Sequence, residues 1–307
     1  MNLQEQKIES ILKFADPIIS NILDKAIAEK EISTKDALEL FDAKGIDFHL
    51  VGMVADILRK RRVGDTVTYV VNRNINFTNV CIKQCGFCAF SRDFREEEGY
   101  LLPVEEIVRR AKEAYQYGAS EVCIQAGLPP DMDGHLYENV CREIKNQIPH
   151  IHIHGFSPEE ILYGATRLAI PPKEFLLRLK DAGVDTIPGT SAEILNQKLR
   201  DKISPGRITV DDWTNIIKTA HKLGIKSTST MMFGHLETNE DKVNHISKIR
   251  EIQKETGGFT EFVPLNFISS EAPMYKHQLH EGIKSGANGN DVLLVHAIAR
   301  IMLNNII

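Results

Sequence analysis

Residues 104–125, VEEIVRRAKEAYQYGASEVCIQ, contain the unit from which the fold is predicted. Apolar residues recur at helical spacing from Val104 to Tyr115, Gly118 follows, and residues 121–125 have the composition of a strand. Glycine suits the left-handed residue that ends a helix. The same order of helix, glycine and strand recurs at Gly183, Gly224 and Gly257. Because consecutive βα units build a parallel sheet, the sequence predicts an α/β fold.

Six strands of this kind are expected, and parallel strands with right-handed crossovers curl into a barrel. They are predicted near residues 74–78, 121–125, 151–154, 184–188, 226–232 and 261–267. A last helix over 291–303 follows, and no seventh or eighth strand is recognisable. We therefore expect a partial or full TIM-type (β/α) barrel over residues 66–307, with its last strands missing if it is partial. A doubly wound open sheet is the structural alternative.

The first 65 residues are predicted to form an N-terminal helical extension. Ser33 and Asp36 are spaced as a capping box, and residues 48–62 form a further amphipathic stretch. Residues 67–71 are rich in β-formers and are expected to begin the strand region.

Charge and hydropathy exclude several classes of protein. The net charge of −5 comes without a basic run, so nucleic acid is not an expected partner. No apolar stretch approaches the roughly 18 residues of a membrane helix, and the N-terminus lacks the pattern of a signal peptide. We expect a cytoplasmic protein that binds neither membranes nor nucleic acid.

Three cysteines, Cys81, Cys85 and Cys88, lie within eight residues. Three thiolates are one short of the usual four around a cubane iron–sulfur cluster, which leaves one iron open to a small molecule. This spacing predicts a catalytic cluster, with a zinc site or a redox pair as alternatives. No fourth cysteine or histidine lies at zinc-finger spacing. An iron–sulfur electron carrier, the third alternative, usually has four thiolates and needs no large barrel.

In a parallel barrel the active site lies at the carboxyl ends of the strands. The cysteine loop follows the first strand, and the loops after the other strands carry glycine or polar residues. These loops are residues 125–130, 155–158, 189–193, 233–237 and 267–270. We expect them to form a ligand-binding rim together with the cysteine loop.

The cysteine loop, with Phe87 just before its last cysteine, resembles the signature of the radical S-adenosylmethionine (SAM) superfamily. The resemblance implies a [4Fe-4S] cluster whose open iron chelates the amino and carboxylate groups of SAM. Reduction then cleaves the sulfonium and releases a 5′-deoxyadenosyl radical. In such an enzyme the protein supplies binding and exclusion of water.

From about residue 5 to the end, the chain resembles the tyrosine-using subunit family of FO synthase (CofH). The motifs are residues 74–81, 88–92, 124–130, 152–158, 188–195, 231–235, 262–267 and 271–275. Dehypoxanthine futalosine cyclase of menaquinone synthesis shares much of this pattern and is the alternative. The runs Pro-Gly-Thr-Ser-Ala-Glu, Leu-Pro-Pro and Glu-Ala-Pro-Met-Tyr favour the FO synthase family. The chain departs from that family at Ala126, where a second glycine is common, and at its C-terminus, where members continue through further strands.

The resemblance implies a transferase of coenzyme F-420 biosynthesis. The adenosyl radical would abstract hydrogen from L-tyrosine, and side-chain cleavage would give a 4-hydroxybenzyl radical that adds to C5 of 5-amino-6-(D-ribitylamino)uracil. The implied partners are a CofG-type subunit, which closes the ring, and an electron donor such as ferredoxin or flavodoxin.

The resemblance also implies site residues. Cys81, Cys85 and Cys88 would hold the cluster. Phe87 would shield it, and Ser191 and Glu193 would lie near the methionyl or ribose part of SAM. Residues 230–237 resemble an adenine-lining element. The full set predicted to bind the cofactor is Phe87, Gln125, Gly127, Ser191, Glu193, Met232, Gly234 and Glu237.

His150, His152 and His154 alternate with isoleucines on the third strand, so one face of that strand is polar. Their different depths make one shared metal ion unfavourable. His154 lies nearest the rim and is predicted to be catalytic, by substrate hydrogen bonding or proton transfer. Asn74, Asn76 and Thr78 share a face of the first strand in the same way and, if that face is inward, are either substrate contacts or polar filling.

Overall fold

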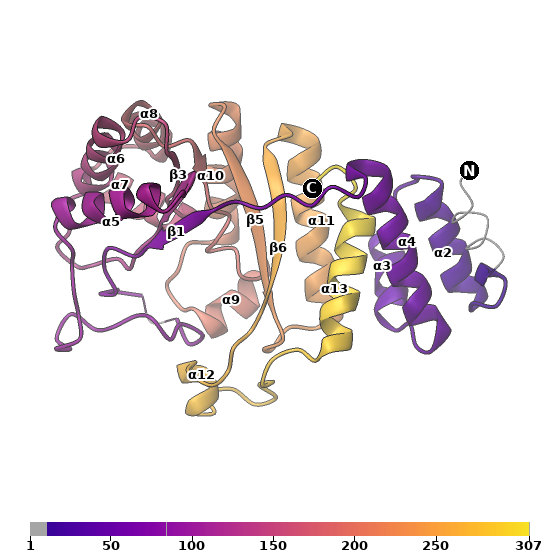
Figure 1. The fold of residues 1–307 in the computed structure, drawn as a ribbon. Coiled ribbons are helices and arrows are strands. Elements are labelled where there is room, and N and C mark those ends of the chain that lie inside the picture. The colour runs from indigo at the N-terminus through magenta and orange to yellow at the C-terminus, as the bar shows by residue number, and fades with distance from the viewer. Residues whose placement is uncertain (1–10, 84, 307) are drawn as a thin grey trace.

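The computed structural model describes residues 11–83 and 85–306. Its centre is a six-stranded parallel sheet whose strands follow one another in chain order (Figure 1). The strands are β1 (Asn72–Ile75), β2 (Glu121–Ile124), β3 (His152–Gly155), β4 (Thr186–Ile187), β5 (Lys226–Phe233) and β6 (Phe259–Asn266). The sheet curls into a half-barrel, and in the described part of the chain β6 does not pair with β1. The predicted partial barrel is confirmed.

Helices follow the strands and cover the convex face of the sheet (Figure 1). They are α5 (Val104–Gln116), α6 (His135–Gln147), α7 (Pro158–Arg167), α8 (Pro172–Ala182), α10 (Val210–Lys222), α11 (Asn239–Thr256) and α13 (Gly289–Met302). The short helices α9 (Gln197–Ile203) and α12 (Pro273–Lys276) lie instead beside the cysteine loop, to which both are hydrogen-bonded. The glycines predicted to end four of them all have positive φ: Gly118, Gly183, Gly224 and Gly257. The sequence analysis did not predict α7, α9 or α12.

The strands bury apolar side chains on the face that meets the helices. Ile75, Val122 and Ile153 are all at most 1 % exposed. Aromatic rings fill the space behind them, and the rings of Tyr137 and Phe156 lie 4.6 Å apart. Because side chains alternate along a strand, the residues between these positions, such as Asn74, Cys123 and His154, point to the concave side.

The N-terminal helices α2 (Pro17–Ile27), α3 (Thr34–Phe41) and α4 (Ile46–Val63) lie at the right of Figure 1, where α3 and α4 pack on α13 and α2 packs on α3 and α4. The predicted capping box at the start of α3 is present: the Ser33 hydroxyl accepts from the Asp36 N–H, and the Asp36 carboxylate accepts from the Ser33 N–H. Residues 1–10 of the predicted extension lie outside the described residues. The division of the chain at residue 65 stays a prediction.

The prediction that the strand region begins at residues 67–71 is wrong. This segment has no strand assignment, and it runs across the front of β5 and β6 in the view of Figure 1 before β1 begins at Asn72. The Val67 and Tyr69 side chains are 88 % and 85 % exposed. The β-branched composition indicated a strand, but β propensity acts only where a neighbouring strand supplies hydrogen bonds and packing.

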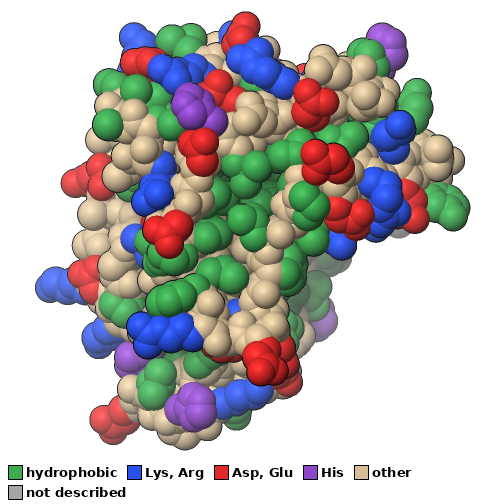
Figure 2. All heavy atoms as spheres, turned by 90° about the vertical axis from the view of Figure 1, so that its left-hand side faces the viewer, with side chains coloured by type: hydrophobic (Ala, Val, Ile, Leu, Met, Phe, Trp, Pro, Cys, Tyr) green, Lys and Arg blue, Asp and Glu red, His purple; other side chains and the backbone are tan. Residues whose placement is uncertain are grey.

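Figure 2 views the side of the molecule that lies at the left in Figure 1. A band of hydrophobic side chains crosses the middle of this face, and acidic and basic side chains alternate around it. Among the described residues, no helix is both long and apolar enough to cross a bilayer.

Candidate active site

A cavity of about 220 Å³ lies at the carboxyl ends of the strands, where the sequence analysis placed the rim. Its lining comes from the loops after β1, β2, β3 and β4 and from a loop after α9. Eight of the predicted cluster and cofactor residues line it together: Cys81, Phe87, Cys85, Cys88, Gln125, Gly127, Ser191 and Glu193.

Backbone hydrogen bonds attach the cysteine loop to its neighbours. Ile82 N–H donates to the Leu128 carbonyl (2.8 Å) on the loop after β2, and Gly86 N–H donates to the Ile203 carbonyl (2.8 Å) at the end of α9. Gly127 allows the loop after β2 to approach the cysteine loop closely, because a Cβ atom at this position would lie 2.3 Å from the Val80 carbonyl oxygen. The loop is therefore held by packed backbone on two sides.

The three thiols of the loop are mostly buried. Burial raises the pKa of Cys81, and it raises the pKa of Cys85 to about 12 although the positive charge of Arg207 acts in the opposite direction. Among the described residues, no three histidine, cysteine or acidic side chains converge closely enough to hold a single metal ion. Cys81, Cys85 and Cys88 nevertheless line one cavity, as the three protein ligands of a single cluster must.

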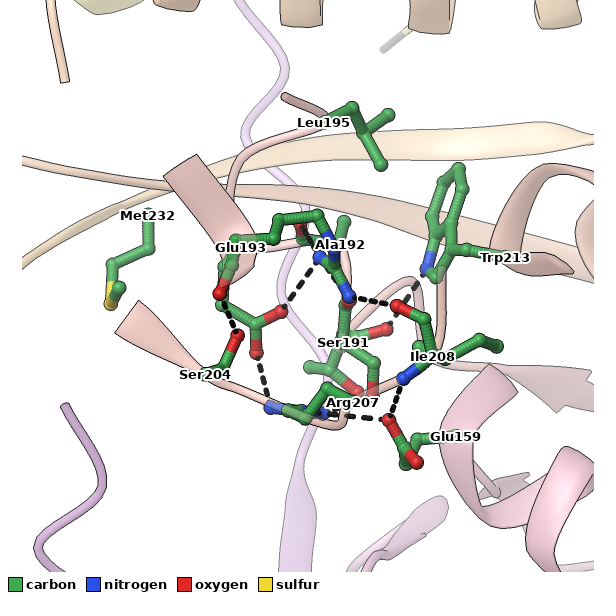
Figure 3. Close-up of polar contacts among 12 residues, drawn as sticks. Glu159, Ser191, Ala192, Glu193, Leu195, Ser204, Arg207, Ile208, Trp213 and Met232 are labelled. Carbon is green, nitrogen blue, oxygen red and sulfur yellow. Dashed lines mark hydrogen bonds and ion pairs between the residues drawn. The ribbon is translucent and has the colours of Figure 1, made fainter. Parts of the chain in front are cut away.

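Arg207 joins three of the loops around the cavity (Figure 3). Its guanidinium contacts a Glu159 carboxylate oxygen (3.2 Å), a Glu193 carboxylate oxygen (2.9 Å) and the Ser191 hydroxyl (2.6 Å). One of its nitrogens lies 3.6 Å from Cys85 Sγ. Burial acts to lower the pKa of Arg207, but the negative charges of Glu193, Cys85 and Glu159 outweigh it and hold the pKa above its ordinary value.

A second arginine shapes the loop that carries Ser191 and Glu193. Arg200 is 1 % exposed and donates to the carbonyls of Ser191 (2.9 Å) and Ala192 (2.6 Å), and also to that of Ile208 (2.6 Å). Ser191 and Glu193 both have positive φ, a conformation that non-glycine residues rarely adopt. The buried guanidinium thus stabilises a turn that exposes two polar side chains to the cavity.

Two of the lining residues contact neighbours across the cavity. The Gln125 amide oxygen accepts from the Thr190 hydroxyl (2.7 Å), which joins the loops after β2 and β4. The Arg207 guanidinium carbon lies 5.9 Å from the centre of the Phe87 ring, within the range of a cation–π contact. Phe87, which belongs to the cysteine loop, therefore faces the charged network around Arg207.

Four predicted site residues do not line this cavity: His154, Met232, Gly234 and Glu237. The Glu237 carboxylate accepts the N–H groups of Gly234 and His235 (2.8 Å each), so it holds its own loop. Met232 N–H donates to the Glu193 carbonyl (2.7 Å) and supports the site from behind. His154 lies on β3, and its role stays a prediction, as do those of the other three.

The sequence analysis missed Lys83, Glu159, Glu160 and Arg207, which line the cavity. Glu159 and Glu160 lie in the first turn of α7, whose start has a recognisable signal: Ser157 and Glu160 form a capping box, with Pro158 as first residue. That signal would have placed a carboxylate beside the rim. Arg207 has no comparable signal, because it lies in an irregular segment after α9.

The Radical SAM superfamily matches residues 75–249. A protein of Methanothermobacter thermautotrophicus named 5-amino-6-(D-ribitylamino)uracil–L-tyrosine 4-hydroxyphenyl transferase is 45 % identical over 286 residues, which cover 93 % of this chain and 77 % of that protein. A protein of the same name from Methanocaldococcus jannaschii is 48 % identical over 283 residues, covering 91 % and 77 %.

Two solved structures share the fold. Methylornithine synthase (PylB) aligns with a TM-score of 0.70 at 17 % identity, over 93 % of this chain and 77 % of that one. The FeFe-hydrogenase maturase HydG from Carboxydothermus hydrogenoformans aligns with a TM-score of 0.72 at 17 % identity, over 99 % and 70 %. The superfamily match and the identity to the two transferases agree with the cysteine loop at the barrel mouth. The chain belongs to the radical SAM superfamily and, within it, to the family of 5-amino-6-(D-ribitylamino)uracil–L-tyrosine 4-hydroxyphenyl transferases.

Proposed function

We propose that this chain transfers the 4-hydroxybenzyl group of L-tyrosine to 5-amino-6-(D-ribitylamino)uracil, a step of FO and coenzyme F-420 biosynthesis. The observation that carries the proposal is the identity of 45 % and 48 % to two transferases of that name, over more than nine tenths of this chain. The transferase name of these relatives favours this reaction over that of the cyclase. A barrel with a cavity beside its cysteine loop favours an enzyme over an electron carrier.

The residues of the mouth fit the cofactors of the superfamily, a [4Fe-4S] cluster and SAM. Cys81, Cys85 and Cys88 would hold the cluster. Ser191, Glu193 and Arg207 would face the polar groups of SAM, since all three line the cavity. When bound, cluster and SAM together supply the 5′-deoxyadenosyl radical after one-electron reduction. Because iron is ligated by thiolates, loading of the cluster would release the protons that the buried thiols of Cys81 and Cys85 otherwise keep.

The chain's own contribution is binding, positioning and exclusion of water. Arg207 fixes the loops after β3 and β4 before any ligand arrives. His154 would accept a substrate hydrogen bond or a proton as a neutral imidazole. Burial, and then the nearby His152, lower its pKa to about 4, so the ring is uncharged at neutral pH.

The chemistry requires two further proteins. A one-electron donor such as ferredoxin or flavodoxin would reduce the cluster, and a CofG-type subunit would close the third ring of the chromophore. The cytoplasm is the expected location, because cysteine thiols stay reduced there.

Anaerobic reconstitution with iron, sulfide and a reductant tests the proposal. With SAM, L-tyrosine and the diaminouracil, mass spectrometry is expected to detect 5′-deoxyadenosine together with the 4-hydroxybenzyl adduct. Turnover of a futalosine-type substrate without this adduct would assign the chain to the cyclase reaction. Absence of 5′-deoxyadenosine from an iron-loaded sample would refute radical SAM activity altogether.

A further inference from the structure

The concave face of β1–β4 carries polar side chains in three rows, which we name by strand register. The lower row is Asn72, Glu121 and His152, the middle row is Asn74, Cys123, His154 and Thr186, and the upper row is Asn76 and Gln125. The upper row also lines the cavity at the mouth. The rows therefore lead from the cofactor site down into the half-barrel.

This composition differs from that of an ordinary barrel interior, which is filled mainly by bulky branched side chains. Asn72 and Asn74 are exposed to solvent, whereas the other polar groups of the rows are partly buried and need hydrogen-bond partners. The branched residues of these strands, such as Ile75, Val122 and Ile153, point instead to the helices. The apolar side chains of these strands thus face the helices, and polar side chains face the concave side, where they could contact a polar ligand.

The rows satisfy only part of their own hydrogen-bonding capacity. The Thr186 hydroxyl lies 2.7 Å from both His152 Nε2 and His154 Nδ1, and with one proton it can donate to only one of them. Among the described residues, the second nitrogens of the two rings, His152 Nδ1 and His154 Nε2, have no hydrogen-bond partner. Asn74 donates to Asn76 (2.9 Å) and retains a free amide oxygen. These atoms remain available to a ligand.

The rows consist mainly of neutral polar groups. On β1–β4 they contain a single carboxylate, Glu121, which accepts from Asn72 (3.2 Å). Lys226 continues the middle row onto β5, in register with Thr186, and is exposed. The groups between these two charges are amides, imidazoles, a thiol and a hydroxyl. A zwitterionic amino acid needs partners for both of its charges. A neutral pyrimidine with a polyhydroxyl chain needs closely spaced neutral donors and acceptors, which amide, imidazole and hydroxyl groups supply.

We propose that the lower and middle rows bind the ribitylaminouracil acceptor, with its ribityl chain directed toward the lower row. This inference rests on the proposed function. The radical forms at the mouth and must reach tyrosine first, so tyrosine lies nearest the cluster and the acceptor lies beyond it. The lower and middle rows are two residues apart along the strands, or about 6.6 Å. This spacing would place the uracil ring at the middle row and direct the five-carbon chain past the lower row.

Two variants of exposed row residues, Asn74→Ala and Asn72→Ala, test the inference in the reconstituted holoenzyme. Each removes hydrogen bonds to a neutral ligand, and we expect KM for the acceptor to rise about three- to tenfold. KM for tyrosine and the rate of 5′-deoxyadenosine formation are expected to stay within twofold. Arg73→Ala is the matched control, because Arg73 is the neighbour of Asn74 on β1 but binds Glu113 on the opposite face. This control is expected to leave both KM values unchanged.

A truncated acceptor, 5-amino-6-methylaminouracil, isolates the contribution of the ribityl chain. With it, wild type and Asn72→Ala are expected to have equal KM values. An unchanged acceptor KM in both variants, an increased KM for tyrosine instead, or an equal loss with the truncated acceptor would each overturn the inference. Titration calorimetry of the holoenzyme with acceptor gives the same comparison without turnover. Acceptor binding that depends on Asn72 without adduct formation would refute the proposed function but not this site.

Discussion

The mouth of the barrel and its lower interior differ in how far the protein satisfies its own polar groups. At the mouth, the Arg207 guanidinium contacts two carboxylates and a hydroxyl before any ligand is present. In the lower interior, His152 and His154 share one hydroxyl and keep nitrogens without partners. The mouth is therefore preorganised for a charged cofactor, whereas the lower rows depend on their ligand for full hydrogen bonding.

Removing a cluster ligand is expected to abolish cofactor binding at the mouth and to leave the lower interior unchanged. In Cys85→Ala, we expect iron to be lost and both 5′-deoxyadenosine and the adduct to fall below detection, because two thiolates cannot retain a catalytic cluster. Iron and sulfide analysis and mass spectrometry check this. Cys141→Ala is the control, since Cys141 is buried on α6, away from the cavity lining. Retained turnover in Cys85→Ala would contradict the cluster assignment.

The saturated network at the mouth is expected to contribute strongly to stability. In Arg207→Met, the carboxylates of Glu159 and Glu193 would lose their shared partner while mostly buried, at 6 % and 11 % side-chain exposure. Glu159 keeps Lys83 (3.4 Å) and Glu193 keeps Arg200 (3.5 Å), so neither charge is left unpaired. We expect the lost hydrogen bonds to lower the unfolding free energy by about 1–3 kcal/mol. Asn74→Ala, in the unsaturated region, is expected to change it by only about 0.5 kcal/mol. Urea denaturation measures both, and equal losses in the two variants would remove the distinction between the regions.

The same difference explains how much of the site the sequence could predict. The cysteine loop, Gln125, Gly127, Ser191 and Glu193 follow predicted strands, and parallel strands bring such loops to one rim. The ion pairs of Arg207 could not be predicted from the sequence. Its partners Glu193 and Glu159 lie 14 and 48 residues away along the chain, and only the tertiary structure brings them together. Conversely, alternation along β3 predicted a polar face that includes His154, but not that Thr186 of β4 joins His152 and His154.

More of the fold than of the site could be predicted from the sequence. All six strands were predicted near their observed positions, because glycine-terminated helices and apolar runs are local signals. The error at residues 67–71 arose because a strand also needs a partner, which local composition does not report. The capping box at Ser157 and Glu160 was readable but was not used, so α7 was missed.

Glu160 provides a test of the mouth through pH. It lines the cavity and accepts from Ser157 and Ala126, and burial raises its pKa to about 7 from an ordinary 4.5. Between these values the unfolded chain releases the proton while the folded chain keeps it, so the unfolding free energy falls as pH rises from about 4.5 to 7. The expected loss is about 3 kcal/mol. It is absent at pH values below this window and complete above it.

Glu160→Gln is expected to remove this contribution, since the amide does not titrate. Urea denaturation from pH 4.5 to 8 on both proteins measures the difference between the two curves. The constant offset caused by the lost acceptor does not affect their slopes. Parallel curves would show that the Glu160 carboxyl group titrates at its ordinary pKa.

The last prediction concerns Ser33, a residue outside both regions. Ser33 caps α3 by accepting from Asp36 N–H (3.0 Å), and Ser33→Ala is expected to lower the unfolding free energy by about 1 kcal/mol. Helix α3 packs on α11 and α13, and α11 packs on β5, so a packed path does lead toward the barrel. If the two regions are held by their own contacts, this loss leaves the acceptor KM and 5′-deoxyadenosine formation within twofold. A larger change in the acceptor KM alone would show that the lower and middle rows depend on the packing of the N-terminal helices.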